Sequence, residues 1–342
     1  MTKWLDGPAT EEDVIISTRI RVARNLSKYK FPSRMSVEES DDLTDDILNT
    51  MKDTLANNYK FMRIRDLNPR EQLVYVEEHL ISPSMLRTKD KSSFLVKDDE
   101  KATIMINEED HIRIQTLSPG LNLKESWEQC SLIDDELEGE LDYAYDEKWG
   151  YLTACPTNVG TGLRASVMLN LPCVSMTGNI NTIIEGLRKV GLTVRGIYGE
   201  GSEALGYLYQ VSNQTTLGQS EEETIDKLNR VINQIISRER STRNYLKGKD
   251  PLKLEDKIFR SFGALTHSRI INSKEAMEHL SNVRLGWAMG LIKNNNLKDI
   301  VKLMIDIQPA KIQERFDSEM TEEERDIARA GIIREFILNM EG

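Results

Sequence analysis

Five arginines stand near turns and strand ends, where their guanidinium groups could gather around one polyanion. Arg19 and Arg21 alternate along the extended segment STRIR (17–21), so both side chains point to the same face. Arg113 lies on a strand face away from the apolar residues, Arg164 follows a glycine-rich turn, and Arg195 opens the loop RGIYGEG. Arginine binds phosphate bidentately, and a nucleoside triphosphate needs several cations. The set favours such a ligand, although each arginine alone is more often a surface ion-pair partner.

A crowded group of carboxylates is the second chemical feature. Glu108, Glu109 and Asp110 share one turn in INEEDHIR (106–113), and Glu200 lies between glycines in a loop. Two carboxylates could grip a guanidinium from two directions and take up a proton, and a protonated guanidinium is a poor nucleophile until it loses one. A solvated acidic turn is the alternative, and the two interpretations stand at even odds.

Cys155 opens the third feature, the run CPTNVGTGLR (155–164). A thiolate beside a guanidinium is stabilised by the positive charge and would orient an attacking nitrogen. The alternative is a small buried hydrophobe, the usual fate of a free cysteine and the one expected for Cys130 and Cys173.

Composition limits the classes of protein to consider. The chain has 342 residues, 39% hydrophobic and 30% charged, with a net charge of −11, which fits a globular protein of two domains. The acidic balance argues against a nucleic-acid binder. We expect no membrane span and a cytoplasmic location, because long apolar runs and signal-peptide features are missing. Three widely spaced cysteines and four unpaired histidines predict no structural metal site.

Strands and helices that would position these residues alternate over the first 240 or so residues. Capping-box pairs predict helices after Ser36 and Ser220, and a further helix is expected at Ile180–Val190. The segment Val14–Ile16 begins an extended stretch leading into STRIR. The other expected strands are Phe61–Ile64, Leu73–Val76, Thr103–Ile106, His111–Thr116, Tyr151–Ala154, Thr193–Ile197 and Tyr207–Ser212.

The character of the chain changes near Lys247–Pro251, where glycine and proline in a charged stretch predict a linker. Beyond it the pattern is helical, and Thr321 with Glu324 predicts the start of a final helix. We therefore expect an α+β domain over residues 1–247, with an antiparallel sheet flanked by helices, and an all-α domain over 251–342.

Together, STRIR, INEEDHIR, CPTNVGTGLR and RGIYGEG resemble the phosphagen (guanidino) kinases, and the closer likeness, over nearly the whole length, is to the bacterial protein-arginine kinases. The motif set is specific because four segments match in order, whereas no P-loop and no eukaryotic-type kinase motif occurs. The likeness implies transfer of phosphate from ATP to arginine side chains of proteins. Two alternative functions stay open. The chain could be a phosphagen kinase that acts on free arginine or another small guanidine, or a non-catalytic adaptor that binds phosphoarginine.

The resemblance also implies roles for residues. Catalysis falls to Glu109, Cys155 and Glu200. Mg²⁺ would be coordinated by the ATP phosphates and would have few protein ligands. The nucleotide would contact His79, the five arginines and their neighbours in the same motifs, which are Ser17, Thr18, Arg19, Ile20, Arg21, Arg113, Arg164, Ala165, Ser166, Val167, Met168, Arg195, Gly196, Ile197, Tyr198 and Gly199.

Two departures from the phosphagen kinases bear on the substrate. Ser17–Thr18 replaces the usual pair of serines and keeps a hydroxyl. About sixteen residues precede the first arginine motif, too few for the helical domain that phosphagen kinases carry there. We expect a more open site that admits an arginine still attached to a protein.

RDIARA (325–330) resembles the family's phosphoarginine-binding motif. Arg325 and Arg329 are i, i+4 neighbours near a helix N-terminus, which suits an anion, and Asp326 could take the guanidinium. With Ala330 they would form an allosteric pocket; without the resemblance, a solvated Asp–Arg pair is favoured.

The family also implies partners. They are a heat-shock repressor and unfolded proteins as substrates, a zinc-binding activator protein, a Clp-type protease that receives the marked proteins, and a second copy of the chain in a dimer or larger oligomer. These would place the protein in the bacterial stress response.

Overall fold

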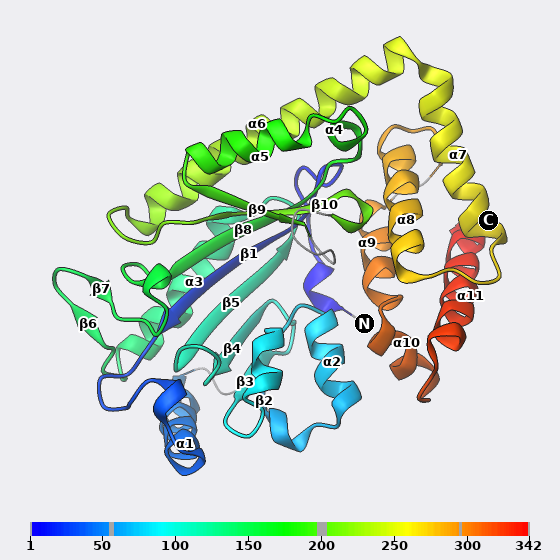
Figure 1. Cartoon of the computed structure of the whole chain (residues 1–342). Coiled ribbons are helices and arrows are strands. Elements are labelled where there is room, and N and C mark those ends of the chain that lie inside the picture. Colours follow the sequence, from blue (N-terminus) through cyan, green and yellow to red (C-terminus); the bar gives the residue numbers. More distant parts are fainter. Residues whose placement is uncertain (1, 55–57, 197–203, 294–295, 341–342) are drawn as a thin grey trace.

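A single eight-stranded antiparallel sheet forms the centre of the molecule, with strand order β2–β3–β4–β5–β1–β8–β10–β9 (Figure 1). The structure, a computed structural model, describes residues 2–54, 58–196, 204–293 and 296–340. In sheet order the strands are β2 (Tyr59–Arg63), β3 (Ser93–Lys97), β4 (Ala102–Ile106), β5 (Ile112–Pro119), β1 (Ile15–Arg24), β8 (Leu163–Asn170), β10 (Leu208–Asn213) and β9 (Leu192–Gly196). The expected antiparallel α+β fold is confirmed.

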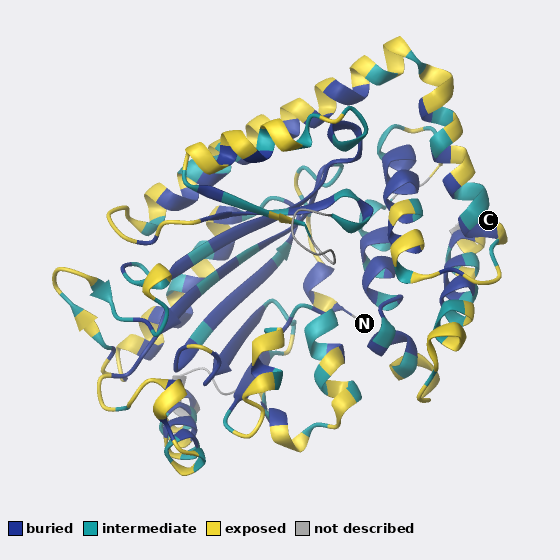
Figure 2. Cartoon of the chain, viewed as in Figure 1, coloured by how far each residue is buried: buried dark blue, intermediate teal, exposed yellow. Residues whose placement is uncertain are grey.

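Helices cover one face of the sheet and enclose the larger core. They are α1 (Val37–Thr54), α3 (Leu123–Glu138), α5 (Ile180–Lys189) and α6 (Glu221–Lys249). Ile20 and Val22 of β1 are fully buried in this core. Because side chains alternate along a strand, Arg19 and Arg21 project from the opposite face, and the burial colours of Figure 2 show the sheet as the buried interior.

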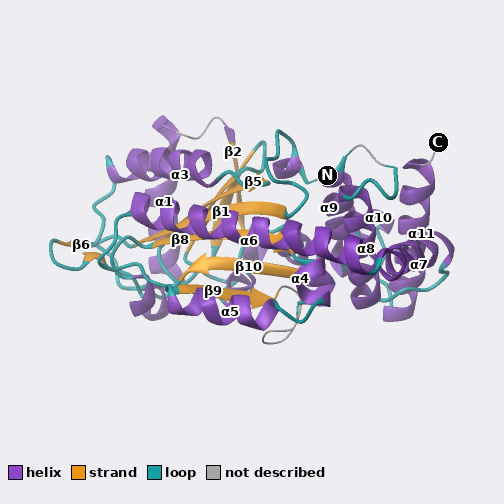
Figure 3. Ribbon diagram, turned by 90° about the horizontal axis from the view of Figure 1, so that it is seen from above, coloured by secondary structure: helices purple, strands orange, loops and turns teal. Residues whose placement is uncertain are grey.

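The C-terminal helices gather at one end of the sheet (Figure 3). They are α7 (Pro251–His267), α8 (Ser273–Ala288), α9 (Leu297–Asp306), α10 (Pro309–Phe316) and α11 (Glu322–Met340). A second core joins Leu280 and Val283 of α8 to Ile16 and Met168 of the sheet, and it includes residues near α2 (Pro69–Glu77). The helical region is thus packed against the same face that carries the arginines.

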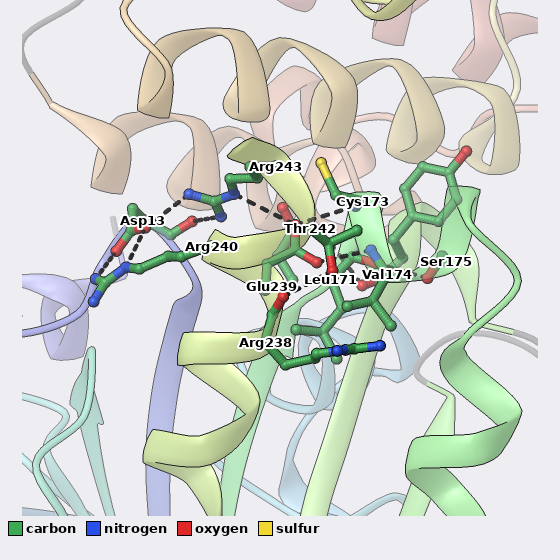
Figure 4. A network of polar contacts seen from close by, with 12 residues as sticks. Asp13, Leu171, Cys173, Val174, Ser175, Arg238, Glu239, Arg240, Thr242 and Arg243 are labelled. Atoms are coloured by element: carbon green, nitrogen blue, oxygen red, sulfur yellow. Dashed lines mark hydrogen bonds and ion pairs between the residues drawn. The ribbon is translucent and has the colours of Figure 1, made fainter. Parts of the chain in front are cut away.

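A buried network of charges ties the N-terminal segment to both regions (Figure 4). Glu239 on α6 accepts hydrogen bonds from the backbone N–H groups of Cys173 (3.1 Å) and Val174 (2.9 Å) at the start of α4 (Pro172–Met176). Arg243, one turn on, donates to the Asp13 carboxylate at 2.7 Å. On the other side, the fully buried Arg284 of α8 donates to the Asp13 carbonyl at 3.3 Å.

Several local predictions are confirmed by the hydrogen bonds at helix starts. Ser220 and Glu223 form a reciprocal capping box at α6, with side-chain-to-backbone distances of 3.1 and 3.0 Å. The pair Ser36 and Glu39 does the same before α1. The last helix begins after Thr321, whose backbone and hydroxyl both bind Glu324.

The predicted strand at Leu73–Val76 is wrong, because these residues lie inside helix α2. Asn68 caps that helix by accepting from the Glu71 N–H at 2.9 Å, Glu71 returns the bond, and Pro69 occupies the first turn. A complete capping box with proline at the first position outweighs the β propensity of the short Val–Tyr–Val run.

Two further elements differ from the expectation. The strand expected at Tyr151–Ala154 is reduced to the two-residue β7 (Gly150–Tyr151), paired with β6 (Tyr145–Asp146). The linker expected near Lys247–Pro251 is only a corner at Asp250 between α6 and α7, with Pro251 starting the second helix.

No helix in the described part of the chain has the length and apolar character needed to cross a membrane.

Candidate active site

A polar cavity of about 380 Å³ lies where the first arginine motif, the acidic turn and the CPTNVGTGLR segment meet. It opens on the sheet face opposite α3 and α6. Its lining comprises Arg21, Val22, Ala23, Ser82, Ser84, Glu108, Glu109, Arg113, Cys155, Thr157, Asn158, Gly162, Arg164, Arg195 and Gln210. Four of the five predicted phosphate-binding arginines are therefore brought together from β1, β5, β8 and β9.

The arginines crowd one another inside this site. Burial lowers the pKa of Arg21 well below its ordinary value, and the charges of Arg19, Arg113 and Arg164 lower it further. Burial and the charges of Arg195 and Arg113 likewise lower the pKa of Arg164. The Arg21 Nε is buried without a hydrogen-bond partner among the described groups. Like charges held together at this cost are suited to a polyanion that would neutralise them.

Arg19 and His79 lie beside the cavity. Helix α2 ends just before His79, which takes a left-handed φ of 64°. Its carbonyl accepts a hydrogen bond from the Gln115 side chain at 2.9 Å. Burial, together with the charge of Arg19, lowers the pKa of His79 to about 3. The imidazole is therefore neutral near pH 7 and lies close enough to Arg19 for the two groups to interact. Its contact with the nucleotide stays a prediction.

The acidic turn presents its three carboxylates in three different ways. Glu108 is buried and forms an ion pair with Arg113, and its carboxylate also accepts from the Glu109 N–H at 2.9 Å. Glu109 is exposed, with one oxygen 3.1 Å from Arg113 Nη2. Only Glu109 of the three extends into open space, where a second guanidinium could bind.

Asp110 holds the acidic turn to the cysteine segment. Its fully buried carboxylate accepts hydrogen bonds from the Ala154 N–H at 2.6 Å and from the Asn25 side chain at 2.7 Å. Burial raises the pKa of Asp110 more than these two hydrogen bonds lower it. The residue next to Ala154 is Cys155, so Asp110 fixes the distance between the acidic turn and the thiol.

The next residue, His111, continues this bracing. Its Nδ1 accepts from the Leu26 N–H at 3.0 Å, which leaves Nε2 to donate to the Lys30 carbonyl at 2.7 Å. Burial lowers the pKa of His111, in keeping with the neutral form. The segment that follows β1 is thereby held against the acidic turn.

Cys155 directly precedes a single 3₁₀ turn (Pro156–Asn158) and is half-buried, with its Sγ 3.0 Å from the Thr157 hydroxyl. Gly162, at φ +65°, follows in the same segment, and a Cβ there would lie 2.6 Å from the Ala23 carbonyl. Glycine is required because the turn packs directly on β1. This close approach places Cys155 and Arg164 on one cavity. The other two cysteines are buried, as expected.

Several residues assigned to the nucleotide from motif neighbourhood do not reach the cavity. Thr18, Ile20, Ala165 and Val167 are fully buried. The Thr18 hydroxyl donates to the Gly120 carbonyl at 2.8 Å and so has a structural partner. The remaining buried ones are Ser17, Ser166 and Met168. Thr18, Ile20, Ala165 and Val167 alternate with the arginines along their strands, so their side chains point to the opposite face. Ser17, Ser166 and Met168 share the arginine face but do not line the cavity. Nucleotide contact by these residues stays a prediction.

Other assignments fall at the end of β9. Gly196 is the last residue of that strand. Ile197, Tyr198, Gly199 and Glu200 lie outside the described residues. The cavity also contains residues that the sequence reading missed, namely Ser82, Ser84, Thr157, Asn158 and Gln210. The Ser82–Ser84 segment is close in sequence to His79, which was the one available signal.

Both arginines of the RDIARA segment have hydrogen-bond partners within the helical region. Arg329 is buried, and its guanidinium donates to the carbonyls of Ile307 (3.1 Å) and Ile271 (3.0 Å) and to the Asp326 carboxylate. Arg325 donates to the Met320 carbonyl at 2.6 Å. Ala330 belongs to the second core. In this conformation Asp326 binds the neighbouring Arg329, and the phosphoarginine pocket stays a prediction.

Among the described residues, no group of three His, Cys, Asp or Glu side chains is placed to hold a metal ion. The cavity is instead rich in cations, which suits phosphate oxygens.

Comparison with known families and proteins shows which family the chain resembles over most of its length. Residues 41–242 match the ATP:guanido phosphotransferase C-terminal catalytic domain, and residues 251–342 match the protein-arginine kinase McsB C-terminal domain. The protein-arginine kinase of Halothermothrix orenii is 46% identical over 334 residues, covering 98% of this chain and 96% of that protein. The protein-arginine kinase of Clostridium tetani is 43% identical over 339 residues, covering 99% of each.

Solved structures agree in fold. Lombricine kinase superposes with a TM-score of 0.61 at 24% identity and covers 71% of each chain. The duplicated taurocyamine kinase from Schistosoma mansoni, with bound transition state analog components, superposes with a TM-score of 0.62 at 23% identity. That match covers 75% of this chain and 38% of the other.

Proposed function

This chain belongs to the ATP:guanido phosphotransferase family, and from that premise we propose that it phosphorylates arginine side chains of proteins with ATP. The cluster of arginines facing an exposed carboxylate and a cysteine across one cavity is the observation that carries the proposal. The curated relatives named protein-arginine kinase support the choice of acceptor, since they align over nearly the whole chain.

The ATP phosphates would bind the cationic side of the cavity. Arg21, Arg113 and Arg164 supply donors there, and the triphosphate would relieve their mutual repulsion. Arg113 is at present bound by Glu108 and Glu109. A phosphate competing for Arg113 would release the exposed Glu109 for the acceptor, while the buried Glu108 keeps its ion pair.

The acceptor guanidinium would bind on the other side, against Glu109 and Cys155. As one of its nitrogens attacks the γ-phosphorus, a P–N bond forms, the bond from phosphorus to the β–γ bridging oxygen breaks, and ADP leaves. The proton lost by the nitrogen passes to a carboxylate. Glu109 is the candidate in the described region, and Glu200 is the second by resemblance. Mg²⁺ carried by the ATP would neutralise phosphate charge.

The choice of acceptor separates this proposal from a phosphagen kinase acting on free arginine or another small guanidine. The enzyme would be incubated with ATP and either free L-arginine or an unfolded arginine-rich protein, with ADP release and protein-bound phosphate both measured. We expect transfer to protein. Robust turnover of the free amino acid with none on protein would overturn the assignment.

We further propose that the helical C-terminal region senses phosphoarginine through Arg325, Asp326 and Arg329. A short series of contacts would connect this region to the nucleotide site. Arg329 binds the Ile307 carbonyl, just before α10, and the N-terminus of α10 is capped by the Glu77 carboxylate at 2.9 Å. His79 follows Glu77 by two residues.

Two adjacent ion pairs strengthen this connection. The buried Lys311 of α10 donates to Glu78 at 2.7 Å and to Glu314 at 2.5 Å. A ligand that withdrew Arg329 from the Ile307 carbonyl would move the α10 terminus relative to Glu77 and Glu78. Binding at the two sites would then be coupled and reciprocal. Phosphoarginine should therefore change ATP affinity in the wild type and not in Glu77→Gln; equal responses in both would contradict this route.

The remaining proposals follow from the family. They are a cytoplasmic role in the bacterial stress response, action on a heat-shock repressor and unfolded proteins, and marking of proteins for Clp-type proteolysis. A zinc-binding activator and self-association as a dimer or larger assembly complete them. Degradation of a phosphorylated substrate by a Clp-type protease, measured with and without this kinase, would test the central one.

A further inference from the structure

A second cavity, of about 570 Å³, lies beside the candidate active site and shares its acidic turn. Glu108 and Glu109 line both cavities. Ala154, directly before Cys155, lines the second one. Glu109 therefore stands at the boundary, with the arginine cluster on one side and the second cavity on the other.

The outer walls of this cavity come from two segments that carry none of the five phosphate-binding arginines. Pro32, Ser33 and Val37 lie around the start of α1, and Arg87, Thr88, Asp90 and Lys91 lie in and after a short 3₁₀ turn (Pro83–Arg87). The lining mixes an apolar edge, hydroxyl groups and charges, which is the character of a surface for a polypeptide rather than for a triphosphate.

Two cations in this cavity stand without a salt bridge to any carboxylate in the described part of the chain. Arg87 is exposed. Lys91 donates to the Met35 carbonyl, and its charge also acts on the carboxylate of Glu39. The lining also contains the carboxylates Asp90, Glu108 and Glu109, of which Glu108 and Glu109 bind Arg113. The exposed Arg87 is therefore a cation with which an acidic residue of a bound polypeptide could pair.

We propose that this cavity holds the stretch of polypeptide around the acceptor arginine, and that Arg87 favours an acidic residue close to that arginine. The inference rests on the proposed function. The triphosphate takes the arginine-lined cavity, so an acceptor that must reach Glu109 enters from the other side. Its flanking residues then lie along the wall that carries Arg87.

The size of the effect follows from the exposure of the interaction. A solvent-exposed ion pair changes an equilibrium by about three-fold, and salt weakens it. We expect the wild-type enzyme to phosphorylate an arginine peptide with neighbouring aspartates about three-fold faster, in kcat/KM, than one with neighbouring lysines. The preference should shrink as the salt concentration rises.

Charge reversal at Arg87 tests the proposal, and Lys89 supplies a matched control. Both residues are exposed in the same loop, but Lys89 does not line the cavity. Arg87→Glu should invert the preference between the two peptides while leaving the KM for ATP unchanged. Lys89→Glu should keep the wild-type preference.

Two results would overturn the inference. One is equal kcat/KM for both peptides with all three enzymes, and the other is the same inversion in Lys89→Glu as in Arg87→Glu. The failure of the underlying function gives a different result: none of the three enzymes phosphorylates either peptide, whether or not free arginine is turned over.

Discussion

Removing the Asp110 carboxylate should separate the cysteine segment from the acidic turn. Asp110→Ala deletes the acceptor for the Ala154 N–H (2.6 Å) and the Asn25 amide (2.7 Å), both in buried surroundings. A hydrogen bond to a charged group contributes roughly 1.5–3 kcal/mol, and partial relaxation of the site brings the total for the pair to about 3 kcal/mol. Asp110→Asn retains one acceptor oxygen, and because burial raises the pKa of Asp110 the charge itself stabilises little. We expect that variant to lose only about 1 kcal/mol.

Urea unfolding gives the two stabilities, and steady-state kinetics with ATP and a protein substrate gives the activity. A displacement of Cys155 by about 1 Å should lower kcat on the order of 100-fold in Asp110→Ala. Asp110→Asn should keep more of it. Equal destabilisation by both substitutions would refute the reasoning, because it would show that the charge, and not the acceptor geometry, holds the turn. Full activity in Asp110→Ala would refute it as well.

Three further predictions concern the charged groups around the site. Arg21→Met should raise the melting temperature of the ligand-free protein, because the substitution removes a buried cation that is repelled by three neighbouring arginines. It should also weaken ATP binding about 10-fold or more. A lower melting temperature would contradict the argument that these arginines repel one another. Glu109→Gln should leave ATP affinity largely intact and lower kcat at least about 100-fold, measured by ADP release; an unchanged kcat would remove Glu109 from the acceptor site. The pKa of His79 in the folded state is depressed to about 3, below the ordinary 6.5, so the unfolded chain binds a proton first as the pH falls. The free energy of unfolding therefore decreases as the pH drops below about 6.5. His79→Asn should lose less of this free energy over the same pH range in urea titrations, and an identical pH dependence in both proteins would contradict the shift.

The sequence identified the chemistry of the site better than its boundaries. Arg21, Arg113, Arg164 and Cys155 could be found because their motifs are specific, and the sheet brings them to one cavity. Contact with Ile20, Ala165 or Val167 was inferred from adjacency alone, and strand alternation buries these residues instead. Periodicity is therefore a necessary correction to motif matching.

Long-range contacts explain the rest of what the sequence could not reveal. Asp110 binds Ala154, 44 positions away, and only the folded sheet places them together. The hydrogen bonds of Arg329 to the Ile307 and Ile271 carbonyls depend on how the helices pack, whereas the i, i+4 pattern indicated only a pair of arginines suited to an anion. The error at Leu73–Val76 was of a different kind, since the Asn68–Glu71 capping box was present in the sequence and outweighed a short β-prone run.

Mass spectrometry of an unfolded arginine-rich protein after incubation with ATP tests the central claim most directly. Samples should be handled near neutral pH, because the P–N bond of phosphoarginine is acid-labile. The account predicts phosphate on arginine side chains with the wild-type enzyme and its loss with Glu109→Gln. Phosphate on serine, threonine or tyrosine, or undiminished arginine phosphorylation by Glu109→Gln, would contradict it.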